Sequence, residues 1–174
     1  GVPGTLVNPD NEVKLAIVSS ARDIARPTWV GKIVRADVEL DLALVRVFKD
    51  GDGNMVRGSS FKTIPIKDTE TLQPGNPLWA FGYPLGVRTI NVTGGNLTGF
   101  EFNANDELSW LRTDAEFNPG NSGGMLVDAT GSLVAVPTRV WRGGALTPVE
   151  LARPAERIPK EWLAALKKGH IDDI

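Results

Sequence analysis

One serine of the chain lies in a stretch that could present it for nucleophilic attack. Ser122 is embedded in residues 118–124, Asn-Pro-Gly-Asn-Ser-Gly-Gly, and an apolar run follows at once. A nucleophilic serine needs an exposed position on a sharp turn, a nearby base, and backbone N–H donors for the developing oxyanion. Glycines permit close substrate approach and unusual backbone angles, so the N–H groups of Gly120 and Ser122 could point into one cavity. The alternative is an ordinary glycine-rich turn with a bystander serine.

The elements that must position this serine are predominantly short strands. Strand-length segments rich in Val, Ile and Trp alternate with turn signals, and we expect turns at residues 50–54, 94–96 and 128–131. A single helix is predicted over residues 154–169, where apolar side chains recur at helical spacing and Gly169 could end it. The pattern therefore predicts an all-β fold, a barrel or a sandwich, with one C-terminal helix. The expected strands lie within residues 12–18, 30–37, 42–48, 77–84, 88–93, 108–114, 123–128 and 132–141.

Composition limits the classes of function. The 174 residues suit one domain or two small subdomains, and 41% hydrophobic content is ample for a core. The net charge of -2 gives no electrostatic reason to expect nucleic acid as a partner, and no apolar run is long enough for membrane insertion. Cysteine is absent, which excludes disulfides and thiol chemistry. The chain opens with glycine and no signal-like segment, which favours a processed or truncated product.

Two motifs resemble those of trypsin-fold serine peptidases, specifically the HtrA-like branch. Residues 111–136, LRTDAEFNPGNSGGMLVDATGSLVAV, resemble the nucleophile region of that family, and residues 34–47, VRADVELDLALVRV, resemble its catalytic-aspartate segment. Residues 73–86 give a weaker match to the strand that opens the second barrel. The resemblance runs from about residue 12 to about residue 166. It implies Ser122 as nucleophile, Asp41 as triad aspartate, and an oxyanion hole made by Gly120 and Ser122.

The resemblance also implies two antiparallel β-barrels. The first would occupy about residues 1–70, the second about 71–150, and the C-terminal helix and tail about 151–174. The strands counted in the first part are too few for a complete barrel, so the first barrel is expected to be incomplete at its N-terminal side. Asp41 should be largely buried if it is the triad aspartate, and Asp37 is the next candidate if it is not.

The triad histidine is missing from its place. The family order is His, Asp, Ser, yet the only histidine is His170, after the serine, where we expect a solvated tail residue. Either the histidine lies upstream of Gly1, or its position is mutated, with Ser19 or Ser20 as the candidates. The second account leaves about twenty residues before Asp41, too few for the strands that the family places there, so we favour the first.

The remaining predictions concern substrate and partners. Glu116 stands six residues before Ser122, at a position that lines the specificity pocket in trypsin-like enzymes, where it could select a basic side chain or simply be solvated. Val136 and Thr138 would offer backbone groups to an extended polypeptide substrate. No cofactor and no metal are expected, because residues 50–54, DGDGN, fit a hairpin turn better than a calcium loop. The sequence does not define the oligomeric state, and localisation follows only from relatives, commonly in the cell envelope or secreted.

We therefore expect a serine endopeptidase domain that acts through an acyl-enzyme and is nearly inactive without the upstream histidine. The alternative function is a catalytically dead peptidase fold that binds an extended peptide or a partner protein without cleaving it.

Overall fold

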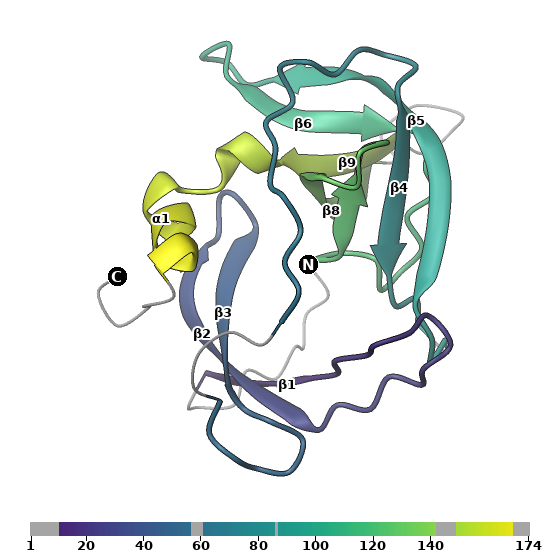
Figure 1. Cartoon of the computed structure of the whole chain (residues 1–174). Coiled ribbons are helices and arrows are strands. Elements are labelled where there is room, and N and C mark those ends of the chain that lie inside the picture. The colour runs from purple at the N-terminus through teal and green to yellow at the C-terminus, as the bar shows by residue number, and fades with distance from the viewer. Residues whose placement is uncertain (1–10, 57–60, 86, 142–148, 169–174) are drawn as a thin grey trace. The chain divides into compact units, whose positions relative to one another are not determined.

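The computed structural model describes residues 11–56, 61–85, 87–141 and 149–168 of the chain (Figure 1). These residues form two compact units. One unit contains the chain up to Phe61 together with the segment from Lys160 onward, and the other runs from Lys62 to Pro159. Each unit has its own antiparallel sheet.

The first unit contains a three-stranded sheet in the order β1-β2-β3. Its apolar face packs tightly around a glycine: a Cβ on Gly31 would lie 2.7 Å from Val45 Cγ1 and 2.8 Å from Leu15 Cδ1. Only glycine leaves room for both neighbours, which explains a glycine in a strand interior. The strands are β1 (Glu12–Leu15), β2 (Trp29–Asp37) and β3 (Leu42–Lys49), and α1 (Lys160–Lys168) groups with this unit.

The second unit is a closed barrel in the order β4-β5-β6-β9-β8-β7. Alternate side chains along its strands point inward, and Leu78, Leu97, Leu111, Leu126 and Val134 are fully buried in the core. Closure pairs every strand on both sides, so the barrel exposes no edge along its length except where a ladder stops short. The strands are β4 (Pro77–Gly82), β5 (Asn91–Phe102), β6 (Leu108–Thr113), β7 (Met125–Val127), β8 (Leu133–Trp141) and β9 (Val149–Pro154).

The all-β prediction is confirmed, and each of the eight predicted segments contributes to a strand. The hairpin at residues 50–54 is also confirmed, because Asp50 N donates to Asn54 O and Lys49 pairs with Met55. The predicted turn at residues 94–96 is wrong, since these residues lie inside β5. A Cβ on Gly95 would be 2.3 Å from Ala115 N, so glycine serves close packing here rather than a turn.

The predicted helix is shorter than expected. Residues 149–154 form β9, Ala155–Arg157 form the 3-10 helix η1, and α1 begins only at Lys160. Ile158 is extended (φ -65, ψ 126), as expected for a residue that precedes a proline. Pro159 therefore fixes the start of α1. None of the helices in the described residues is long and apolar enough to span a bilayer.

Candidate active site

Ser122 lies on an exposed turn between β6 and β7. The turn begins with a hydrogen bond from Asn121 N to Asn118 O, of 2.9 Å, and Gly120 at its third position has a φ of +106°. Proline in the second place and a positive φ in the third define a type II turn. Gly123 also has a positive φ, of +80°, so a glycine with a left-handed backbone lies on each side of the Asn121–Ser122 pair, and Ser122 itself is exposed.

The serine is tied to β8 by two hydrogen bonds. Ser122 Oγ donates to Thr138 O over 3.1 Å, and Gly123 N donates to Pro137 O over 2.9 Å. The hydroxyl thus has a carbonyl partner in the described structure and no base. The chain's one histidine, His170, lies outside the described residues.

The end of β4 and the segment that follows it pack closely on the same turn. Leu85 N donates to Pro119 O over 2.9 Å. A Cβ on Gly120 would lie 2.4 Å from Tyr83 O, and a Cβ on Gly124 would lie 2.1 Å from Phe81 O. Both glycines are therefore required for backbone-to-backbone contact, in addition to any role at the serine.

Asn121, directly before the serine, is fully buried, and its Oδ1 and Nδ2 have no hydrogen-bond partner among the described residues. A buried polar group without a partner costs about 1–3 kcal/mol of stability. This feature was missed from the sequence, where asparagine in a glycine-rich turn indicates exposure. Its side chain turns inward because Gly82 on β4 leaves space for it.

Asp41 lies in the turn between β2 and β3, is exposed, and has a φ of +57°. The expectation that this side chain is buried is wrong for the described structure, because Asp41 is the last residue of the exposed turn that leads into β3, where an aspartate tolerates a positive φ. Asp37, the second candidate, is half-buried, and its Oδ1 accepts a hydrogen bond of 2.9 Å from Leu40 N. Both aspartates belong to the first unit and Ser122 to the second, so a catalytic pairing between them stays a prediction.

The predicted substrate-binding residues lie in the barrel with the serine. Glu116 is exposed, and its carbonyl accepts a 2.8 Å hydrogen bond from Thr93 Oγ1. Val136 and Thr138 lie on β8, whose ladder with β7 contains only Leu133 and Ala135. Beyond Ala135 the ladder with β7 stops, and β8 meets the serine turn instead, where Pro137 O and Thr138 O accept the hydrogen bonds from Gly123 N and Ser122 Oγ.

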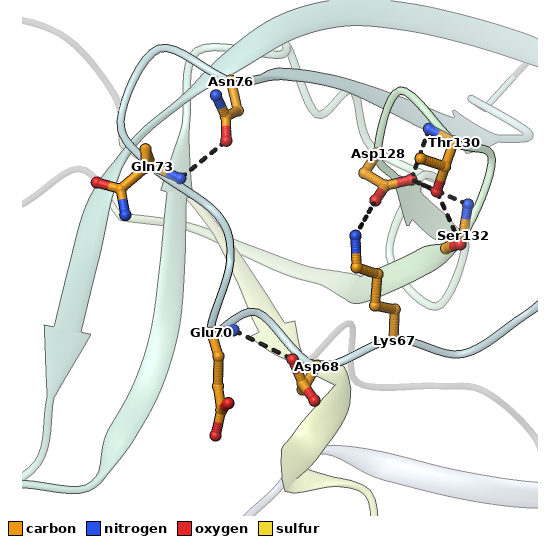
Figure 2. Close-up of polar contacts among 8 residues, drawn as sticks. All are labelled: Lys67, Asp68, Glu70, Gln73, Asn76, Asp128, Thr130 and Ser132. Atoms are coloured by element: carbon orange, nitrogen blue, oxygen red, sulfur yellow. Dashed lines mark hydrogen bonds and ion pairs between the residues drawn. The ribbon is translucent and has the colours of Figure 1, made fainter.

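A buried carboxylate fixes the strands that follow the serine (Figure 2). Asp128, at the end of β7, accepts hydrogen bonds from Thr130 N (2.8 Å), Ser132 N (3.1 Å) and Lys67 Nζ (3.2 Å). Burial by itself would raise the pKa of Asp128, but the hydrogen bonds from Thr130, Ser132 and Lys67 outweigh it and hold the pKa below its ordinary value. The chain around Lys67 is bound to β8 as well, through Lys67 N to Leu133 O (3.0 Å). Asp128 thus links the β7–β8 turn to the segment that leads into the barrel.

Comparisons with known proteins agree on one family. The model of the trypsin-like peptidase domain matches residues 4–136. A probable periplasmic serine endoprotease, DegP-like, of Marinomonas sp. is 30% identical over 157 residues, covering 81% of this chain and 31% of that protein. The serine protease PepD of Mycobacterium tuberculosis is 36% identical over 122 residues, covering 65% of this chain and 24% of PepD.

Solved structures agree with the sequence comparisons. The HtrA-type protease AlgW with a decapeptide has a TM-score of 0.64 and 26% identity, covering 84% of this chain and 43% of that chain. The chain thus spans less than a third of the length of the two curated relatives, and under half of AlgW. The closed barrel, the three-stranded sheet of the first unit and the C-terminal helix correspond to the two-barrel fold of these proteases.

Proposed function

The chain belongs to the trypsin-like peptidase family, in its HtrA-like branch, and from that premise we propose that it hydrolyses peptide bonds through an acyl-enzyme on Ser122. The observation that carries the proposal is the exposed serine on a turn of positive-φ glycines, held against β8 beyond the end of its ladder with β7. This arrangement offers both a nucleophile and a place for an extended substrate.

The proposed chemistry has two stages. Ser122 Oγ attacks the scissile carbonyl carbon while a histidine takes the hydroxyl proton, and the carbonyl oxygen becomes an oxyanion that accepts hydrogen bonds from Gly120 N and Ser122 N. The tetrahedral intermediate then expels the amine, which receives the proton from the histidine, and the acyl group remains on Oγ. In the second stage water, deprotonated by the same histidine, releases the acid and restores the serine. We keep Asp41 of the motif as the residue that orients this histidine, although its side chain is exposed in the described structure, and the half-buried Asp37 is the alternative. We propose that the histidine is supplied by residues upstream of Gly1.

The substrate would be an extended polypeptide. Its backbone would pair with β8 at Val136 and Thr138, and Glu116 would favour a basic side chain on the acyl side of the cleaved bond. AlgW, which shares the fold, has been solved with bound peptides, which supports this class of ligand. The DegP-like relative is named as periplasmic, which supports a place in the cell envelope or outside the cell.

A second candidate is a binding module that holds such a peptide without cleaving it. The observation in its favour is the hydrogen bond from Ser122 Oγ to the carbonyl of Thr138, which leaves the hydroxyl engaged with a group that cannot accept its proton. The two candidates share the β8 surface and differ only in the chemistry at the serine.

Cleavage of an unfolded protein separates the two. The protein expressed with its natural upstream region should cut a denatured casein, and the Ser122→Ala variant should lose about 10⁶-fold in kcat while still binding the substrate. If the upstream-extended protein binds casein with the same affinity as its Ser122→Ala variant but never cuts it, the peptidase proposal fails and the binding module replaces it.

A further inference from the structure

We infer that the main-chain N–H of Leu85 is a positioning group for catalysis: it fixes the orientation of the Pro119–Gly120 peptide and so aims Gly120 N–H at the oxyanion. The inference rests on the proposed function, because it assigns a role within the same site. Leu85 does not belong to the motif around the serine. It lies between β4 and β5, and both β5 and β6 separate it from the serine turn in the sequence.

The turn that precedes Ser122 could adopt either of two backbone forms. Asn118, Pro119, Gly120 and Asn121 form a type II turn, closed by the 2.9 Å hydrogen bond from Asn121 N to Asn118 O. Type I and type II turns share their first and last residues and differ by a half-turn of the central peptide. Proline in the second place suits both types, and glycine in the third place accepts either sign of φ. The sequence of the turn therefore allows both orientations of the central peptide.

Leu85 selects one of them. Its N–H donates to Pro119 O over 2.9 Å, and Pro119 O is the carbonyl of the central peptide. In a planar trans peptide the C=O and the N–H point in opposite directions. With its carbonyl held toward Leu85, the peptide directs Gly120 N–H away from Leu85. A type I turn would reverse the peptide, break the bond to Leu85, and bring Gly120 N–H round to the side of the 83–85 segment.

The packing around the turn explains why this contact is close. A Cβ on Gly120 would lie 2.4 Å from Tyr83 O and 3.0 Å from Leu85 N. The segment 83–85 therefore lies directly on the turn, at a distance that only a glycine allows. A second turn holds the segment itself, since Val87 N donates to Pro84 O over 3.0 Å.

The catalytic consequence is specific to the transition state. An oxyanion donor acts only when it already points to where the negative charge develops, because reorienting a dipole during the reaction costs free energy. Losing one such donor lowers kcat by about 10²–10³-fold. Loss of the Leu85 N–H should reduce kcat in the same direction, by at least about tenfold, and should leave KM nearly unchanged, since bound substrate carries no oxyanion.

Two substitutions at one position test this. Leu85→Pro removes the N–H, and proline fits there because Leu85 follows Pro84 in the second place of a turn and is not among the residues with positive φ. Leu85→Ala keeps the N–H and removes a side chain that is 80% exposed. In the upstream-extended protein, Leu85→Pro should lose at least about tenfold in kcat with KM within twofold, and Leu85→Ala should retain the wild-type kcat. Equal kcat for the two variants, in proteins of equal melting temperature, would overturn the inference.

An activity-independent measurement keeps the inference separate from the proposed function. Amide hydrogen exchange at Leu85 in the upstream-extended wild-type protein should be slowed at least about tenfold relative to the free-chain rate, although its side chain is exposed. Free exchange at Leu85 would remove the hydrogen bond and the inference with it, even if the protein is a peptidase. Protection at Leu85 in a protein that never cleaves would refute the proposed function and its catalytic consequence, and would leave only the structural contact.

Discussion

Gly82 on β4 lies directly against the buried side chain of Asn121, so that a Cβ at position 82 would be 2.5 Å from Asn121 Oδ1 and 2.8 Å from its Cα. The residue that precedes the candidate nucleophile is therefore seated in a space that exists only because a neighbouring strand carries no side chain. This contact joins the barrel core to the serine turn.

Gly82→Ala should destabilise the protein by about 1–3 kcal/mol, because the added methyl overpacks this space. Urea unfolding followed by tryptophan fluorescence measures the change in the free energy of unfolding. The matched control is Gly94→Ala on β5, where the new Cβ would be 3.5 Å from Trp79 and should change stability by no more than about 0.5 kcal/mol. Equal effects of the two substitutions would contradict the close packing at Gly82.

The buried Asp128 should make stability depend on pH. Because its pKa is lowered in the folded protein, the carboxylate stabilises the fold at pH values above its unfolded pKa, near 4, and this contribution is lost as pH falls through the lowered folded value. Asp128→Asn should therefore lower the free energy of unfolding at pH 7 by about 1–3 kcal/mol, and the difference from wild type should shrink below about pH 4.

Lys67→Met separates the ion pair from the other hydrogen bonds of Asp128. The Lys67 side chain is 39% exposed, so its removal should cost no more than about 1 kcal/mol. Asp128→Asn and Lys67→Met are compared by urea unfolding at pH 7 and at pH 3. A larger loss from Lys67→Met than from Asp128→Asn would show that the ion pair, rather than the N–H groups of Thr130 and Ser132, stabilises this turn.

Asp41 and Asp37 can be distinguished as the partner of the histidine. Asp41→Asn should lower kcat by about 10³–10⁴-fold in the upstream-extended protein, because the amide favours the wrong histidine tautomer. Asp37→Asn should have little effect on kcat, and its remaining carbonyl oxygen can still accept the hydrogen bond from Leu40 N. Steady-state hydrolysis of a peptide ester measures both. If Asp37→Asn causes the large loss and Asp41→Asn does not, the assignment of Asp41 is wrong.

Much of the fold could be predicted from the sequence because most strands are short apolar runs flanked by turn residues, as in β2, β3 and β8. Two errors have the same cause: the strand β9 was not predicted, and a turn was predicted at residues 94–96, inside β5. The strand β9 contains the buried charged residues Glu150 and Arg153, and β5 contains two adjacent glycines, so neither has the composition of a strand. Tertiary packing decides both cases, since the Arg153 guanidinium stacks 3.6 Å from the centre of the Trp110 ring and Gly95 lies against Ala115.

For the candidate site, too, local features could be predicted from the sequence and tertiary contacts could not. The serine turn could be located because its glycines and proline have local backbone roles that the sequence records. The contacts that hold the turn could not, because Gly82, Leu85 and Thr138 reach it from distant parts of the chain. The burial of Asn121 could not be predicted for the same reason. The exposure of Asp41 shows that a sequence motif can identify a residue without predicting how buried it is.

The central claim is that Ser122 is an activated nucleophile once the upstream region supplies a histidine. The most direct measurement is labelling with a fluorophosphonate, which reacts with activated serines, followed by mass spectrometry to locate the adduct. We expect an adduct on Ser122 in the upstream-extended protein, none in its Ser122→Ala variant, and little or none in the 174-residue chain. An upstream-extended protein that is folded, has no histidine before Gly1 and stays unlabelled would contradict the account.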